Sequence, residues 1–448
     1  MNKKLVLGIA SILAVATLLG GCGGGNGTAG NGEKKKIRMT YAASEIDGIN
    51  QELDVIFADF YAEHPEAEIV LEEGGSTMMA KIAANDAPDI IRVSAATDIP
   101  TFANRNIIMP LDDMLAKSEL FDKDDIFPLA LKAFTYDGKD FGKGNIYGLP
   151  KDWTPDFMWV NKALFDEAGI SVPTLEDPMT YSELSAAVKA LTKKDGNDIS
   201  VFGLNDITGG KPYRAELMLN LMGKSMWSED YKKVKLDDPE VRAAFRYIYD
   251  MEINGYAPSE IHPIDGAGLA DFPKGKIGIF NAGLWVGGGF AKAEGATVSV
   301  DDMIACPPAV ADGTNKIVTS GSPTGAVIYA KTENPELVFD CWEFIHLGKP
   351  AEIRASKALN LPVKKSVAAK VAIDNEFLMK NFNFVTKMSE ECESITVRSN
   401  PYVSNSGVSG VITKYYIPML NGQFSFDEAM DKMQSELQIL IDEGVENF

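Results

Sequence analysis

Hydrophobic positions follow two spacings along the chain. Residues 36–44 (KIRMTYAAS), 67–73 (AEIVLEE) and 88–94 (PDIIRVS) are short runs of mainly apolar side chains, which predict strands. Residues 49–65 instead repeat apolar side chains at helical spacing up to Pro65, which predicts an amphipathic helix. Because strands alternate with helices, we expect a mainly parallel sheet covered on both faces.

The same alternation continues in the second half of the chain. Residues 157–170 (FMWVNKALFDEAGI) predict a strand followed by a helix that ends at Gly169. Thr180 and Glu183 form a capping box before an apolar helical stretch. Residues 237–256 predict a helix with Pro239 at its start and a glycine past its end. The sequence therefore predicts an α/β fold throughout.

The first 36 residues have a different composition. Lys3 and Lys4 precede an apolar run that ends near Leu19, which is typical of a secretory signal. Residues 19–22 (LGGC) resemble the lipobox of bacterial lipoproteins, in which the cysteine sulfur receives a diacylglycerol and the cysteine becomes the first residue. We therefore expect a signal peptide over residues 1–21, a lipidated Cys22 and a flexible glycine-rich linker over residues 22–36. Such an anchor places the protein on the outer face of the cell membrane.

Length, charge and cysteine content narrow the function. The chain has 448 residues, enough for two domains, and a net charge of −21, which argues against nucleic acid and against anionic ligands. Cys306, Cys341 and Cys392 give no disulfide framework, and whether Cys306 pairs with Cys392 stays open. The three histidines are far apart and none lies in a zinc motif, so we expect no metal and no cofactor.

Several blocks occur together in a characteristic order. They are residues 87–115, residues 147–191, residues 272–285 (FPKGKIGIFNAGLW) and residues 321–345. With the first strand and helix they cover nearly all of residues 37–445, and together they resemble the family 1 extracellular solute-binding proteins. These are the substrate receptors of bacterial ABC importers and include sugar-binding lipoproteins.

The resemblance implies a two-lobed periplasmic-binding-protein-like fold of type II. Lobe one would contain residues 37–149 and 317–370, and lobe two residues 150–316 and 371–448. The lobes would close on a ligand by hinge motion, and the receptor would deliver it unchanged to the transmembrane permease subunits. We therefore expect a monomeric binding protein rather than an enzyme, with a carbohydrate as its ligand.

Sugar sites join an aromatic wall to a few convergent polar groups. Trp285 follows a strand, where the family places a ring in the cleft, although a core position is the alternative. Asp152 and Trp153 lie at the first crossover. Asp152 would accept hydrogen bonds from sugar hydroxyls and Trp153 would stack on a sugar ring; the alternative is that both belong to a packed hinge. Tyr213 opens a helix from a glycine turn, where matching family positions contact sugar. The remaining candidates lie at strand ends or on returning segments: Ser44, Glu45, Ser94, Thr97, Ser322 and Tyr402.

The other tryptophans are expected elsewhere. Trp159 and Trp342 lie inside a strand and a helix, which favours core positions, and Trp227 lies in a stretch that the family treats as a loop away from the cleft. Residues 92–100 (RVSAATDIP) lack the tryptophan and the Asp-Arg pair of the maltodextrin branch, which argues against maltodextrin. Two alternatives remain: a surface-anchored glycoside hydrolase with two carboxyl groups at a defined separation, and a receptor for a polyamine or peptide.

Overall fold

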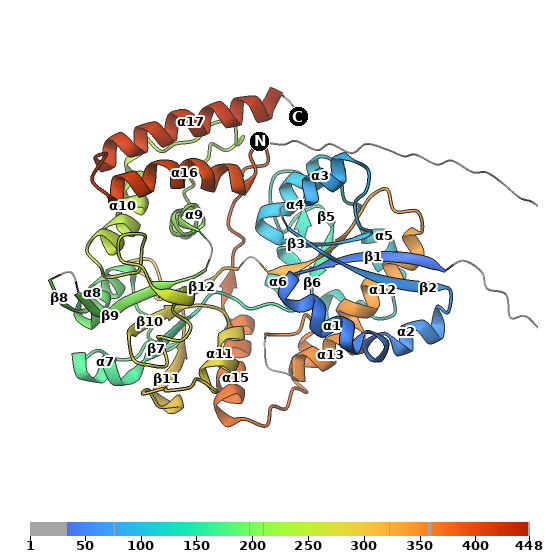
Figure 1. The fold of residues 1–448 in the computed structure, drawn as a ribbon, viewed down its shortest axis with the longest axis horizontal. Helices are drawn as coiled ribbons and strands as arrows, with labels where there is room; N and C mark the ends of the chain where they lie inside the picture. Colours follow the sequence, from blue (N-terminus) through green and yellow to red (C-terminus); the bar gives the residue numbers. More distant parts are fainter. Residues whose placement is uncertain are drawn as a thin grey trace, which may run out of the picture.

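The protein folds into two α/β lobes that lie side by side (Figure 1). In this computed structural model each lobe is built on its own five-stranded sheet. The predicted signal peptide and Cys22 lie outside the described residues, as does nearly all of the linker. The structure describes residues 34–75, 77–196, 198–208, 210–321, 323–356 and 360–446.

The sheet of lobe one has the strand order β2-β1-β3-β13-β6. Strand β1 pairs in parallel with β2 and β3, whereas β13 is antiparallel to both β3 and β6. The sheet is therefore mainly parallel, as expected, with one strand inserted by a segment that returns from lobe two. The strands are β1 (Lys35–Tyr41), β2 (Ala67–Glu73), β3 (Ile90–Ser94), β6 (Gly148–Pro150) and β13 (Thr324–Ile328).

Helices and a small hairpin surround this sheet. The predicted helix over residues 49–65 is two helices, α1 and α2, that meet at Phe57, a core side chain that is 1% exposed. The elements are α1 (Ala43–Ile56), α2 (Ala58–Glu63), α3 (Met78–Ala83), α4 (Ala95–Asn104), α5 (Asp112–Leu115), η1 (Lys123–Asp125), α6 (Pro128–Lys132), β4 (Thr135–Tyr136), β5 (Asn145–Ile146), α12 (Pro335–Leu347), α13 (Lys349–Ser356) and α14 (Lys365–Ala368).

The sheet of lobe two has the order β11-β7-β10-β9-β8 and is more mixed than expected. Only β9 and β10 pair in parallel; β7 is antiparallel to both of its neighbours. Strands β8 and β9 form a tight hairpin at Gly196, whose φ of +58° suits glycine. The strands are β7 (Met158–Asn161), β8 (Lys193–Asp195), β9 (Asp198–Asp206), β10 (Ile277–Asn281) and β11 (Met303–Cys306).

The local signals in lobe two have the predicted structure. Thr180 and Glu183 form the reciprocal capping box, Gly169 ends its helix with a φ of +68°, and Pro239 starts its helix. The elements are α7 (Lys162–Ala168), α8 (Tyr181–Leu191), α9 (Lys211–Leu221), α10 (Pro239–Ile253), η2 (Asp265–Gly268), η3 (Leu284–Val286), α11 (Gly287–Phe290), η4 (Val300–Asp302), α15 (Glu376–Glu391), α16 (Asn405–Leu420) and α17 (Phe426–Glu446).

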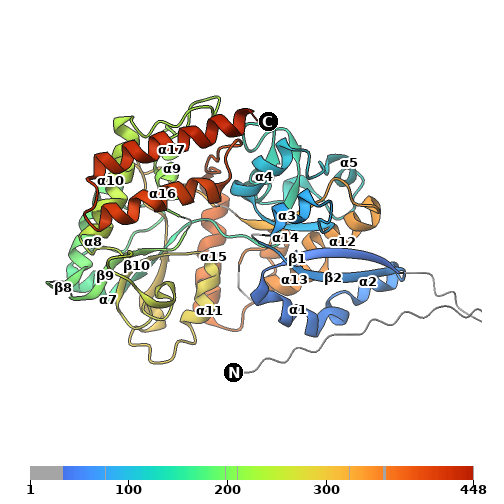
Figure 2. The same cartoon turned by 45° about the horizontal axis from the view of Figure 1, so that its top comes forward.

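The C-terminal helices complete lobe two although they are last in the sequence. In Figures 1 and 2, α16 and α17 lie alongside each other over α9 and α10. Their apolar faces share one core cluster with α9 and α10, which includes Leu219, Phe245, Tyr416 and Leu437. None of the helices in the described ranges is long and apolar enough to span a bilayer.

Segments that connect the lobes run beside one another. The backbone N–H of Asp156 donates to the carbonyl of Ser320 at 2.7 Å, and β12 (Val318–Thr319) pairs with β14 (Glu393–Ser394). Cys306, Cys341 and Cys392 are all free, so the question of a Cys306–Cys392 disulfide is answered: the two thiols do not pair.

Candidate functional site

A cleft of about 410 Å³ lies between the lobes, within the roughly 300–1,000 Å³ typical of small-molecule sites. Ser94 and Thr97 reach it from the β3–α4 junction of lobe one, and the crossover segments supply Asp152, Thr154 and Asp156. The lining from lobe two comprises Tyr213, Glu216, Trp227, Trp285, Arg398 and Ser399, among others. The cleft therefore meets the carboxyl end of β3, as expected for open α/β sheets.

Trp285 presents an exposed ring to this cleft. It lies on η3, just after β10, and is 44% exposed, which excludes the alternative of a core position. Gly283 makes the arrangement possible, because a Cβ there would lie 2.8 Å from the Trp285 ring and 2.4 Å from Thr154 Cγ2. The Leu284 N–H donates to Thr154 Oγ1 at 3.2 Å, which fixes η3 against the crossover. These contacts fix the backbone that carries the indole ring at the cleft.

Tyr213 and Asp156 form a polar group beside that ring. Tyr213 lies in the first turn of α9, after the glycine turn, as predicted. Its hydroxyl donates to Asp156 Oδ2 at 3.4 Å, and the Ser320 hydroxyl donates to the same oxygen. Burial, together with the nearby Asp206 carboxylate, raises the pKa of Asp156 to about 7. This group joins α9 to both crossover segments.

Glu216 is a buried carboxyl group at the edge of the cleft that the sequence analysis missed. It lies one turn after Tyr213 on α9 and is 2% exposed. Its oxygens accept from the Ser225 hydroxyl, from the Met226 N–H at 2.7 Å and from Asn220 Nδ2 at 2.8 Å. Burial raises its pKa to about 7. The available signal was its helical spacing of three residues from Tyr213.

The expectation that Trp227 lies away from the cleft is wrong. Glu216 holds the turn at residues 225 and 226 against α9, and this turn brings the 5% exposed Trp227 to the cleft wall. The correction depends on a hydrogen bond between residues ten positions apart, which local sequence does not reveal.

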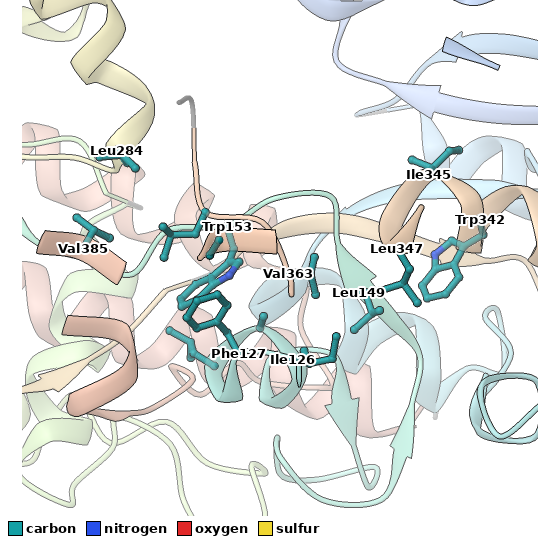
Figure 3. Packing of buried hydrophobic residues seen from close by; sticks show 14 of the residues in the cluster. Ile126, Phe127, Leu149, Trp153, Leu284, Trp342, Ile345, Leu347, Val363 and Val385 are labelled. Carbon is teal, nitrogen blue, oxygen red and sulfur yellow. The ribbon is translucent and has the colours of Figure 1, made fainter. Parts of the chain in front are cut away.

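Asp152 and Trp153 occupy the hinge. Asp152 accepts from Asn360 Nδ2 at 2.8 Å and lies 3.9 Å from Arg354 Nε. Trp153 borders the cleft but is 2% exposed, and its indole N–H donates to the Pro362 carbonyl at 3.2 Å. Figure 3 shows its ring against Phe127, with ring centroids 5.2 Å apart. The expectation of a stacking ring at Trp153 is therefore corrected: the packed-hinge alternative describes it.

Ser94 and Thr97 line the cleft from lobe one. Ser94 is the N-cap residue of α4, and its backbone N–H donates to Asp98 Oδ2 at 2.8 Å. The Thr97 hydroxyl donates to the Ser94 carbonyl at 3.0 Å. Thr97 therefore offers a ligand hydroxyl mainly an acceptor oxygen.

Of the remaining predicted residues, Tyr402 does not line the described cleft, and the side chains of the other three are not described. Tyr402 is wrong as a cleft residue: it packs against the core of the C-terminal helices, with its carbonyl so close to Gly444 that a Cβ there would lie 2.2 Å away. Arg398 and Ser399 on the same segment take its place. Ser44 and Glu45 belong to the first turn of α1 rather than to a strand end, and their side chains lie outside the description, as does Ser322.

The cleft contains further polar side chains that sequence reasoning did not select. They come from the crossover, from the loop after β9, from the segment between α13 and α14, and from α16: Thr154, Thr208, Asn360, Asn405 and Ser409. Within the described ranges, no three His, Cys, Asp or Glu side chains are grouped so that they could hold a metal ion. The polar wall thus carries hydroxyl, amide and carboxyl groups together with the Arg398 guanidinium group.

Comparisons with known proteins agree with this geometry. The family described as "Bacterial extracellular solute-binding protein" matches residues 43–347. A "Probable sugar-binding periplasmic protein" of Rhizobium meliloti is 22% identical over 393 residues, which is 82% of this chain and 83% of that protein. An "Uncharacterized ABC transporter extracellular-binding protein" of Pyrococcus horikoshii is 24% identical over 64% of this chain and 68% of its own.

Solved structures share the fold. The ABC substrate-binding protein of Listeria monocytogenes in complex with cycloalternan has a TM-score of 0.68 at 19% identity, with 92% of this chain and 99% of that chain covered. The two-lobed α/β architecture is therefore that of periplasmic sugar-binding proteins.

Proposed function

Because the chain belongs to the family of bacterial extracellular solute-binding proteins, we propose that it is the extracytoplasmic receptor of an ABC importer and that it binds a mono- or oligosaccharide between its lobes. The Rhizobium meliloti relative is named as sugar-binding and the Listeria monocytogenes protein holds cycloalternan, which support a carbohydrate cargo. The observation that carries the proposal is the exposed Trp285 ring, which lines the cleft together with polar groups from the crossovers and lobe one.

In the proposed complex the Trp285 ring packs against the C–H face of a sugar ring. Carbohydrate hydroxyls then reach Tyr213 and Asp156 on one side and the Thr97 oxygen on the other. Trp153 and Asp152 serve the hinge, and their hydrogen bonds to residues 360 and 362 keep the crossover segments together as the lobes move. A ligand that contacts both lobes stabilises the closed state by its greater affinity for that state.

In the proposed mechanism, lobe one consists of residues 37–149 and 317–370, and lobe two consists of residues 150–316 and 371–448. The paired segments near Asp156 and Ser320 then lie at the division, which suits a hinge. The protein acts as a monomer and delivers its cargo to the permease subunits unaltered.

A receptor rather than a hydrolase is favoured by how the carboxyl groups of the cleft are used. Asp156 accepts from Ser320 and Tyr213, and Glu216 accepts from three protein donors. A glycosidase needs one of its two carboxyl groups free to protonate the leaving oxygen and the other free to attack or to activate water. Both groups already accept hydrogen bonds from the protein, as does Asp152, the third carboxyl group that lines the cleft.

The proposed location is the outer face of the cell membrane, with Cys22 as the lipid anchor. Residues 19–22 support it through their lipobox pattern. Metabolic labelling with a radioactive fatty acid should label the wild-type protein in cells, and Cys22→Ser should abolish the label and release the protein into the medium. A labelled Cys22→Ser protein would contradict the anchor.

Calorimetric titration of the mature chain with a panel of mono- and oligosaccharides tests the function, with product analysis of each mixture. Saturable binding with unchanged saccharide is expected. Cleaved saccharide would establish the hydrolase instead. Binding of polyamines or peptides alone would reject the carbohydrate cargo while keeping the receptor class.

A further inference from the structure

A second hollow of about 300 Å³ adjoins the cleft. Arg398 and Ser399 border both hollows, so the two hollows are neighbours that share a wall at these residues. The second hollow lies across the two lobes. One wall comes from the end of α6 and the β4–β5 hairpin, which packs on the sheet of lobe one, and the other comes from the end of α9 and residues 395–399.

This second hollow is basic in a strongly acidic protein. Five cationic side chains line it, whereas Asp140 is the one acidic side chain in its described lining. The chain as a whole has a net charge of −21. We call this hollow the basic hollow; its cationic residues are Lys132, Lys139, Lys143, Lys224 and Arg398.

The protein's own acids neutralise these cations only in part. Lys143 Nζ lies 3.7 Å from Asp140, and Lys224 Nζ lies 3.1 Å from Glu240. The Lys132 ammonium donates to the Ser394 carbonyl at 2.9 Å, which leaves its charge uncompensated. Lys139 and Arg398 are exposed and form no ion pair with any described residue. Positive charge thus accumulates on both sides of the gap between the lobes.

We propose that the basic hollow binds the anionic group of an acidic oligosaccharide, a carboxylate or a sulfate, while a neutral part of the same ligand packs on Trp285. This inference rests on the proposed carbohydrate function and narrows it to acidic sugars. Arginine and lysine form their stronger hydrogen bonds with such oxyanions. An oxyanion between the two walls also relieves the repulsion between like charges of the two lobes, so it favours closure.

This proposal departs from the expectation that the acidic net charge argues against anionic ligands. Screening limits the reach of a surface charge to about 8 Å at physiological ionic strength, so distant carboxylates contribute little inside the hollow. The five cations that line it determine the local potential.

A pair of matched ligands tests the inference on the mature chain. A uronic-acid trisaccharide and its methyl ester differ in charge and in one small methyl group on each carboxyl group, and a sulfated trisaccharide with its desulfated form makes a second pair. We expect the charged member of at least one pair to bind at least about tenfold more tightly at low salt, and we expect this preference to shrink as salt is raised. The pair that shows the preference identifies the anion as carboxylate or sulfate.

Variants locate the preference in the basic hollow. K139Q/K143Q should reduce the affinity for the charged ligand at least about threefold and leave affinity for the neutral ligand unchanged. Lys117→Gln removes an exposed lysine elsewhere on lobe one and should change neither affinity. Equal binding of charged and neutral members in both pairs, or a preference that K139Q/K143Q leaves undiminished, would overturn the inference and leave the carbohydrate receptor standing. Absence of binding by all saccharides would instead reject the proposed function.

Discussion

Replacement of Trp285 by alanine tests whether the exposed ring holds the ligand. A tryptophan side chain buries about 150–250 Å² when fully covered, and Trp285 is 44% exposed. A ligand can therefore cover on the order of 100 Å² of the ring. Covering half of that area contributes about 1.2 kcal/mol at about 25 cal/mol per Å². Favourable ring geometry adds about 0.5–1.5 kcal/mol.

We therefore expect Trp285→Ala to weaken saccharide binding by about 10- to 100-fold, since 1.4 kcal/mol corresponds to about tenfold. Calorimetric titration with the saccharide found in the screen measures the change directly. Trp285→Phe keeps a ring at the same place and should retain most of the affinity. Because the ring is exposed, the thermal midpoint of unfolding should change little.

A buried tryptophan supplies the matched control. Trp342 stacks on His346 in the core of lobe one, and its indole N–H donates to the Ala326 carbonyl at 2.8 Å. Trp342→Phe should lower stability and leave saccharide affinity unchanged. If Trp285→Ala bound saccharide within twofold of the wild type, the ring would have no role in binding and the reasoning from exposure would be refuted.

Three further predictions follow from buried groups. Trp153→Ala should destabilise the protein by about 3–5 kcal/mol in denaturant titrations, because it opens a cavity in the hinge core; a loss below 1 kcal/mol would contradict that packing. Gly203→Ala should cost about 1–3 kcal/mol, since its Cβ would lie 2.0 Å from the Val188 carbonyl oxygen on α8; unchanged stability would show that β9 and α8 separate freely. The pKa of Glu216 is about 7 in the folded protein and ordinarily 4.5, so the folded state keeps a proton that the unfolded chain releases. Stability should therefore fall as pH rises from 4.5 to 7, with a contribution on the order of 3 kcal/mol, and Glu216→Gln should remove this part of the pH dependence; identical slopes for both proteins would rule it out.

Much of the fold could be predicted because its signals are local. The strand over residues 67–73, the capping box at Thr180 and the helix end at Gly169 depend on residues within a few positions of one another. The division of residues 49–65 into two helices could not be predicted, because Phe57 is buried among rings from α2 and α12 that periodicity does not place. The mixed order of the second sheet likewise depends on pairings between distant strands.

The candidate site was predictable where a residue follows a strand or a glycine turn. Trp285 and Tyr213 fit that description and line the cleft. The expected environments were wrong for Trp153, Trp227 and Tyr402. The exposure of an aromatic ring depends on which distant segments of the chain pack against it. Phe127 covers Trp153, and the turn that Glu216 holds brings Trp227 to the cleft wall.

The sequence alone determined that this is a two-lobed α/β receptor, since the periods, caps and ordered family blocks are written along the chain. It also determined the net charge, which governs the long-range electrostatic potential but not the local potential at a site. Tertiary structure alone decided which charged and aromatic side chains line the cleft and the basic hollow. Lys139, Lys224 and Arg398 are distant in sequence, but the fold brings them to one hollow. Because salt screens charges over about 8 Å, the potential in that hollow depends on its spatial neighbours rather than on the composition of the whole chain.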